Sequence, residues 1–143
     1  MSNKKNKGLV GYTQGTFDTL HYGHVRLLKK AKENCDYLIV GVNSDELVEN
    51  YKKTKTIIKE KERAEIVSAL KYVDEVHIVD SLDKIDKHNL FHFDVCFIGS
   101  DWEGSERYKK TEEDLTKVGA KMVYLPYTSG ISTTIVKQTL KKE

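Results

Sequence analysis

The sequence predicts a single α/β domain in which a five-stranded parallel sheet lies between helices. Apolar runs with strand character alternate with amphipathic runs at helical spacing from Leu9 to the end of the chain. This alternation implies right-handed crossovers and a parallel sheet with helices on both faces. The 143 residues fit one domain, which we assign to residues 9–143, preceded by a flexible polar N-terminus at residues 1–8.

The expected strands are short apolar runs. Tyr37–Val42 is continuously apolar, which is typical of a central parallel strand buried on both faces. The complete set of expected strands is Leu9–Tyr12, Tyr37–Val42, Val73–Val79, Val95–Ile98 and Lys121–Leu125.

The expected helices occupy the segments between these strands. The first begins near Tyr22, because His24, Leu28, Ala31 and Cys35 recur at helical spacing. Asn43–Glu46 is a turn or a short helix start, and a lysine-rich loop follows from Lys52 to Lys59. Later helices are placed at Glu62–Leu70, with Ile66, Val67 and Leu70 inward, at Leu82–Leu90, at Glu106–Val118, and in a C-terminal segment ending at Leu140.

Composition indicates an ordinary soluble domain. Hydrophobic residues make up 38% and charged residues 32%, and no apolar run approaches the length of a membrane span. A net charge of +2 gives no argument for nucleic acid or membrane as a partner. Cys35 and Cys96 match no metal or redox spacing, so both are expected to be buried apolar residues in a reducing compartment. We therefore expect a cytoplasmic protein.

The stretch from Gln14 to His24 carries the strongest chemical signal. It follows the first strand, contains Gly15, and places His21 and His24 on the first turn of the next helix. Free backbone N–H groups and the positive end of the helix dipole attract phosphates there. Capping or core histidines would give the same pattern, and a zinc site is not expected because only two ligands are visible.

Several motifs together resemble the nucleotidyltransferases that carry the His-x-Gly-His signature. In order and spacing they are similar to bacterial glycerol-3-phosphate cytidylyltransferases over about Leu9 to Lys137. The motifs are Gly15-Thr16-Phe17-Asp18, His21-Tyr22-Gly23-His24, Arg63-Ala64-Glu65, Tyr72-Val73-Asp74-Glu75-Val76, Gly99-Ser100-Asp101-Trp102-Glu103-Gly104 and Gly130-Ile131-Ser132-Thr133-Thr134. The resemblance implies a Rossmann-like fold, a divalent metal such as Mg²⁺, and a homodimer.

The resemblance also implies roles for individual residues. The catalytic set is His21, His24, Lys55 and Arg63. Nucleotide contacts are expected from Gly15, Thr16, Phe17, Asp18, His21, His24, Asp101, Tyr127, Gly130, Ile131, Ser132, Thr133 and Thr134, and acceptor contacts from Lys53, Lys55 and Lys84. The loops around Asp101 and Gly130 should converge with the first loop at one edge of the sheet.

Some assignments leave alternatives open. Asp18 orients its loop, forms an Asx turn or helps to hold the metal ion. Arg63 neutralises triphosphate charge or forms a surface ion pair, and Lys52 rivals Lys53 and Lys55 because the lysine-rich loop is one residue longer than in similar sequences. Plain surface charge would also explain these lysines.

Two positions depart from the pattern of the resembled enzymes. Tyr127 stands where an arginine is common, and Ser100-Asp101 replaces an aspartate pair. Tyrosine cannot make a bidentate phosphate contact. The reaction that the resemblance implies is cytidylyl transfer from CTP to glycerol 3-phosphate. Ribitol 5-phosphate, phosphoethanolamine or phosphocholine as acceptor, ATP as donor, or a non-catalytic nucleotide-binding module remain alternatives.

Overall fold

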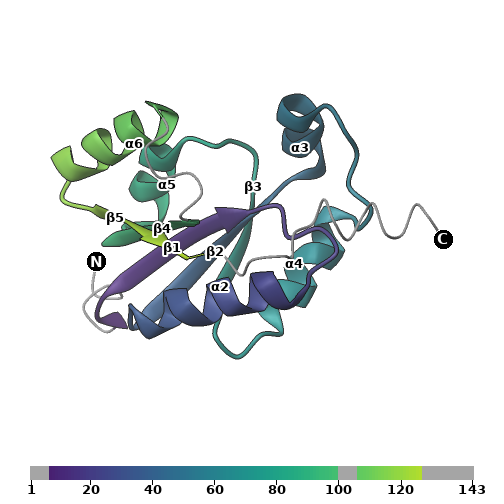
Figure 1. Cartoon of the computed structure of the whole chain (residues 1–143), viewed down its shortest axis with the longest axis horizontal. Helices are drawn as coiled ribbons and strands as arrows, with labels where there is room; N and C mark the ends of the chain where they lie inside the picture. The colour runs from purple at the N-terminus through teal and green to yellow at the C-terminus, as the bar shows by residue number, and fades with distance from the viewer. Residues whose placement is uncertain (1–6, 100–105, 127–143) are drawn as a thin grey trace.

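The computed structural model describes residues 7–99 and 106–126 and is built on a five-stranded sheet, shown in Figure 1. All strand pairs are parallel, and the strand order is β3-β2-β1-β4-β5. The strands are β1 (Val10–Gly15), β2 (Tyr37–Asn43), β3 (Glu75–Val79), β4 (Val95–Gly99) and β5 (Lys121–Leu125). The predicted five-stranded parallel sheet is confirmed.

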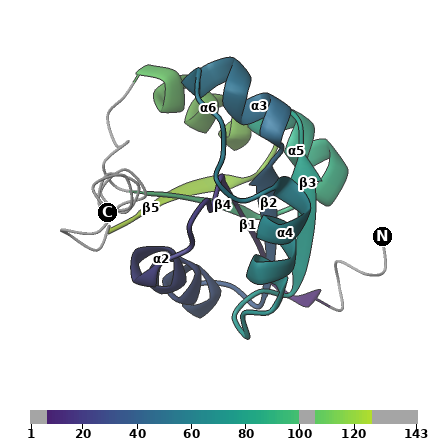
Figure 2. The same cartoon turned by 90° about the vertical axis from the view of Figure 1, so that its right-hand side faces the viewer.

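Helices cover both faces of this sheet. They are α2 (Tyr22–Glu33), α3 (Asp45–Lys52), α4 (Glu60–Ser68), α5 (Lys84–Phe91) and α6 (Glu106–Lys117). Figure 2 shows α2 and α4 on one side of the strands, with α5 and α6 on the other. Helix α3 leaves the carboxyl end of β2 and therefore lies at the edge of the sheet where the strands end.

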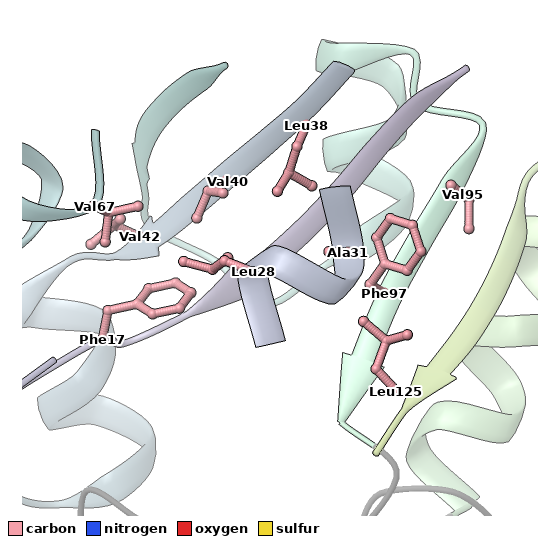
Figure 3. Packing of buried hydrophobic residues seen from close by; sticks show 10 residues of the cluster. All are labelled: Phe17, Leu28, Ala31, Leu38, Val40, Val42, Val67, Val95, Phe97 and Leu125. Atoms are coloured by element: carbon pink, nitrogen blue, oxygen red, sulfur yellow. The ribbon is translucent and has the colours of Figure 1, made fainter. Parts of the chain in front are cut away.

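The core divides into two apolar layers because successive strand residues point to opposite faces. Along β2, Leu38, Val40 and Val42 pack with Leu28 of α2 and Val67 of α4, as Figure 3 shows. The residues between them point the other way. The second layer, beneath α5 and α6, consists of Val10, Tyr12, Ile39, Phe93, Cys96, Ile98, Leu115, Ala120 and Met122.

The strand order places β1 at the centre of the sheet. From β1 the chain builds outward through β2 and β3, and then crosses to β4 and β5 on the other side. In open parallel sheets, ligands bind beyond the carboxyl ends of the strands at such a reversal. The loop that follows Gly15 therefore starts at the position where a ligand site is expected.

Strand β1 extends three residues beyond the predicted end at Tyr12. Its polar residues are accommodated because they have hydrogen-bond partners: the Thr13 hydroxyl donates to the carbonyl of Phe97 at 3.0 Å. Buried polar groups are tolerated when they are paired in this way. The polar composition of Thr13 and Gln14 concealed the carboxyl-terminal end of this central strand.

Two burial predictions were wrong. Ile66 was expected to point inward, but 39% of it is exposed, and the buried residues of α4 are Arg63 and Val67. Arg63 and Val67 are four residues apart and share one helix face, from which Ile66 is offset by one residue. Cys35 is only half-buried, whereas Cys96 is buried as expected.

Other boundaries shifted by a few residues. Helix α4 begins at Glu60 rather than Glu62, β3 at Glu75 rather than Val73, and α5 at Lys84 rather than Leu82. Several sequence-based predictions lie outside the described residues. They concern the loops around Asp101 and Gly130, the residues Trp102 and Tyr127, and the expected C-terminal helix. Within residues 7–99 and 106–126, no helix has the length and apolar character needed to cross a membrane.

Candidate active site

His21 and His24 form the N-terminal cap of α2. His21 is the N-cap residue, with an extended backbone, and its Nδ1 accepts a hydrogen bond from the N–H of Gly23 at 3.1 Å. The N–H of His21 in turn donates to Nδ1 of His24 at 3.2 Å. Histidine nitrogens thus take the places of the hydroxyl and carboxylate in an ordinary capping box. The two interpretations of these histidines, as helix caps and as ligand-binding residues, are therefore compatible. Capping uses only Nδ1 of each ring and leaves Nε2 for other contacts.

These caps fix where the ring protons are. A neutral imidazole has one donor nitrogen and one acceptor nitrogen. Because both Nδ1 atoms accept backbone hydrogen bonds, both Nε2 atoms carry the proton. Nε2 of His21 is buried and has no partner within the described part of the chain. A buried unpaired donor is costly, so this N–H is suited to an oxygen supplied by a ligand.

Both histidines are held neutral. Burial lowers the pKa of His21 below its usual 6.5. For His24, burial together with the nearby His21 and Lys52 lowers the pKa to about 4, and Asp18 only partly opposes this. In the ligand-free protein at pH 7, the pair therefore presents neutral N–H donors rather than imidazolium cations. An approaching phosphate dianion would raise both pKa values.

The loop between β1 and α2 is strained and tightly packed. Phe17 and Thr19 adopt positive φ angles of 55° and 50°, which are uncommon for residues other than glycine. The Phe17 ring is buried and meets the His24 ring edge-on, with centroids 5.5 Å apart. A Cβ atom on Gly15 would approach the Phe17 ring to 3.0 Å, so glycine leaves room for it. Such strain often accompanies functional loops.

Asp18 joins this loop to the end of the lysine-rich loop. Its buried carboxylate accepts hydrogen bonds from the N–H groups of Ile57, at 2.8 Å, and Ile58, at 2.9 Å. The partners are about 40 residues away in sequence, so the contact is not an Asx turn. These contacts support the orienting role of Asp18, and its role as a metal ligand stays a prediction.

Arg63 lies in the same junction. Its guanidinium is fully buried and donates to the carbonyls of Thr16 and Asn43, while a further nitrogen reaches the Asp45 carboxylate at 2.6 Å. The side chain also donates to the carbonyl of Ile58 at 2.8 Å. The surface ion pair is wrong, because the guanidinium is buried. The donors of Arg63 face protein acceptors, which supports a positioning role, and its catalytic role stays a prediction.

Asp45 completes the junction. Its carboxylate accepts from Arg63 and from the Thr56 hydroxyl, and Asp45 and Glu60 each accept the backbone N–H of the other. Partial burial raises the pKa of Asp45, but these hydrogen bonds outweigh it and lower the pKa below the usual value. Asp45 therefore fixes the start of α3 to the start of α4.

The candidate lysines differ in position. Lys52 is the last residue of α3, and its charge is one of those that lower the pKa of His24. Lys53 follows in a left-handed conformation with φ of 58°, and Lys55 is exposed. Among the described residues, neither Lys53 nor Lys55 makes a side-chain hydrogen bond or ion pair. Of the three lysines, Lys52 is the one whose charge acts on His24, and the choice of the lysine that contacts the substrates stays a prediction.

Lys84 occupies a different environment. It is the first residue of α5, only 5% exposed, and donates to the carbonyl of Leu82 at 3.1 Å. Its ammonium lies 5.9 Å from the centre of the Tyr108 ring. It therefore lies where α5 packs against α6, and its predicted contact with the acceptor stays a prediction.

Three residues of this site were not singled out from the sequence: Asn43, Asp45 and Tyr51. Asn43 ends β2 and Asp45 follows it directly. Polar residues immediately after a buried parallel strand are a recognisable signal for a ligand site, and it was available here. Tyr51 had no such signal, because its hydroxyl, which lies 3.1 Å from that of Thr16, reaches the first loop only through the way α3 folds.

The described residues do not build a metal site by themselves. No group of three His, Cys, Asp or Glu side chains in this part of the chain is arranged to hold a metal ion. The Asp18 carboxylate already accepts two backbone N–H groups. A magnesium ion commonly uses only one or two protein ligands and completes its coordination with phosphates and water.

Together, the all-parallel fold and the paired histidine donors at a helix N-terminus define a domain of the nucleotidyltransferase type. Residues 12–139 match the family model described as cytidylyltransferase-like. The chain belongs to the cytidylyltransferase-like family. The match spans most of the chain, including the undescribed residues 100–105 and 127–139.

Similar proteins of known activity have nearly the same length. The chain is 39% identical over 130 residues to the glycerol-3-phosphate cytidylyltransferase of Bacillus subtilis, covering 90% of this chain and 94% of that one. It is 40% identical over 129 residues to the enzyme of the same name from Staphylococcus aureus, covering 90% and 92%. A lipopolysaccharide core biosynthesis protein from Thermoplasma volcanium has the same fold, with a TM-score of 0.71, 24% identity, and coverage of 85% and 97%.

Proposed function

We propose that this protein transfers the cytidylyl group of CTP to sn-glycerol 3-phosphate, giving CDP-glycerol and pyrophosphate. The observation that carries this proposal is the near full-length identity of about 40% to two glycerol-3-phosphate cytidylyltransferases, in a chain that keeps both histidines. The same resemblance was apparent in the motifs of the sequence, and the comparisons agree with it.

In the reaction, a phosphate oxygen of glycerol 3-phosphate attacks the α-phosphorus of CTP. The bond from this phosphorus to the oxygen that bridges to the β-phosphate breaks, and pyrophosphate leaves. The nucleophile is already anionic, so little base catalysis is needed. Positioning and stabilisation of charge supply most of the rate.

His21 and His24 suit this task because their Nε2–H groups are fixed in direction by the caps at Nδ1. We assign them to the α-phosphate oxygens, where negative charge builds up. Donors that need no reorganisation are the most effective for this purpose. Lys52, Lys53 and Lys55 would neutralise the phosphates from the loop beyond α3, while Asp18 and Arg63 hold that loop to the first one.

Other parts of the proposal depend on residues outside the described structure. We expect Asp101 and Tyr127 on the nucleotide side and Gly130–Thr134 at the β- and γ-phosphates, as the resemblance implies. A magnesium ion would arrive with the triphosphate and neutralise part of its charge. We also propose a cytoplasmic homodimer whose product serves glycerol-phosphate polymers of a bacterial envelope, and light scattering of the purified protein would test the dimer.

The decisive experiment measures pyrophosphate release with Mg²⁺ across two nucleotides and four acceptors. With CTP, we expect the highest kcat/KM for sn-glycerol 3-phosphate, compared with ribitol 5-phosphate, phosphoethanolamine and phosphocholine. ATP should be a poor donor. Preference for an amino-alcohol phosphate or for ATP would contradict the proposal, and absence of turnover with every pair would indicate a nucleotide-binding module.

A further inference from the structure

A continuous chain of hydrogen-bonded side chains runs from the core to the rim of the site. The buried Tyr12 hydroxyl donates to Oε1 of Gln14 at 2.7 Å, and Nε2 of Gln14 donates to Oδ1 of Asn43 at 2.9 Å. Nδ2 of Asn43 then donates to the hydroxyls of Thr16, at 3.2 Å, and Tyr51, at 3.3 Å. This chain links β1, β2 and the end of α3.

The direction of each hydrogen bond follows from the first. Because Oε1 of Gln14 receives the Tyr12 hydroxyl, its amide nitrogen faces Asn43, and it also donates to the carbonyl of Ser81 at 2.9 Å. This orientation forces the amide nitrogen of Asn43 toward Thr16 and Tyr51. A Cβ atom on Gly41 would collide with the Tyr12 hydroxyl, so glycine at this position keeps the start of the chain in place.

Tyr51 is the last member of this chain and precedes Lys52. Its hydroxyl also lies 3.1 Å from that of Thr16. The Tyr51 hydroxyl therefore contacts one group of the first loop, the Thr16 hydroxyl, and one group of β2, the Asn43 amide. The Lys52 ammonium lies 5.7 Å from the centre of the Tyr51 ring, within the range of a weak cation–π contact. On the far side of the loop, Thr56, Ile57 and Ile58 are held by Asp45 and Asp18. Residues 52–55 therefore lie between two segments that are held by hydrogen bonds, Tyr51 on one side and residues 56–58 on the other.

We propose that Tyr51 is a positioning residue: through its hydroxyl it holds the end of α3 against the first loop, so that Lys52 stays beside the histidine pair to meet the acceptor or triphosphate. This inference rests on the proposed function for its kinetic consequence. Its structural part, that the Tyr51 hydroxyl holds the end of α3 and thereby Lys52 in position, is independent of which substrate is used.

The test uses Tyr51→Phe, which keeps the ring and removes only the hydroxyl. Tyr37→Phe is the matched control, because its hydroxyl also donates to a side chain, Glu75, but at the opposite end of β2. We expect kcat/KM of Tyr51→Phe to fall about five- to tenfold, the usual worth of one hydrogen bond, and that of Tyr37→Phe to stay at the wild-type value. Equal losses in both variants, or no loss in Tyr51→Phe, would overturn the proposal.

A double-mutant cycle with Lys52→Met separates tethering from general destabilisation. If Tyr51 acts through Lys52, then Tyr51→Phe should cost little more once Lys52 is gone, whereas additive losses would overturn the proposal. NMR titration of the ligand-free protein gives a second readout. In Tyr51→Phe the His24 pKa should rise because Lys52 moves away, whereas His21 and Asp18, which also influence this pKa, keep their positions. An unchanged His24 pKa contradicts the tether, and this readout holds even if no CDP-glycerol is formed.

Discussion

The imidazole rings of His21 and His24 stack with their centres 4.0 Å apart, and each ring accepts a backbone hydrogen bond of the same helix turn. The two side chains thus complete the start of α2 and also present their outer nitrogens to the site. Helix capping uses Nδ1 of each ring, and the proposed contact with substrate uses Nε2. Substitutions can therefore separate the two roles.

His21→Asn and His24→Gln should separate them. Asparagine is a good N-cap residue, and glutamine at the third helix position caps in the same way as histidine does here. Both variants should keep nearly wild-type stability but lose about 10²- to 10³-fold in kcat, because a donor to the developing charge is gone. Pyrophosphate release and urea unfolding measure the two effects. Near-normal kcat in both would refute the assignment.

Stability should fall as the pH is lowered through the range below 6.5. The folded state holds the His24 pKa down to about 4, and that of His21 is lowered as well, against the usual 6.5. Below pH 6.5 the unfolded chain binds protons that the folded protein does not bind, so the free energy of unfolding decreases, by up to about 1.4 kcal/mol per pH unit for His24. Above pH 6.5 these groups contribute no pH dependence.

Urea unfolding between pH 4 and 8 checks this prediction. His24→Gln should flatten the slope between pH 6.5 and 4, since its side chain does not titrate. If the variant and the wild type lose stability in parallel over this range, His24 is not the group responsible.

Arg63→Met should destabilise the fold rather than act only on turnover. The change leaves the partly buried Asp45 carboxylate and the carbonyls of Thr16 and Asn43 without their partner, and each buried acceptor left unpaired typically costs about 1–3 kcal/mol. Thermal and urea unfolding would show this. Arg26→Met, at an exposed arginine of α2, is the control and should change little. A stable but inactive Arg63→Met would instead favour a direct catalytic role.

Asp18→Asn distinguishes an orienting residue from a metal ligand. Asparagine offers one acceptor where two N–H groups need one each, so one buried N–H loses its partner at a cost of about 1–3 kcal/mol. We expect a loosened lysine-rich loop, with a raised KM, and an unchanged Mg²⁺ concentration for half-maximal activity. A marked shift in the Mg²⁺ requirement would show that Asp18 binds the metal.

Methionine substitutions should rank the loop lysines. We expect the largest loss of kcat/KM for Lys52→Met and smaller losses for Lys53→Met and Lys55→Met, because Lys52 is the lysine whose charge reaches His24. The losses should shrink at high salt, which screens phosphate contacts. Lys117→Met, at the exposed end of α6, is the control. A larger effect at Lys55 than at Lys52 would restore the assignment made from the sequence.

The fold was predictable because strand and helix periodicities are local properties of the chain. The Tyr37–Val42 run and the start of α2 at Tyr22 were both found in this way. Predicted boundaries were wrong where tertiary contacts allow polar residues to be buried. At the end of β1, for example, Thr13 is buried because its hydroxyl donates to a backbone carbonyl of β4. The roles of the site residues stay predictions until the variants above are measured.

By itself, the sequence determined the family, the parallel sheet and the histidine pair at the start of α2, because motif spacing and apolar periodicity lie within short stretches of chain. Only the tertiary structure showed that Arg63 and Asp18 join the two loops, and that the charge of Lys52 acts on His24. The reason is physical: a charged side chain can contact either a ligand or a distant backbone group. Burial and hydrogen-bond partners, which arise when residues 40 apart meet, decide between the two.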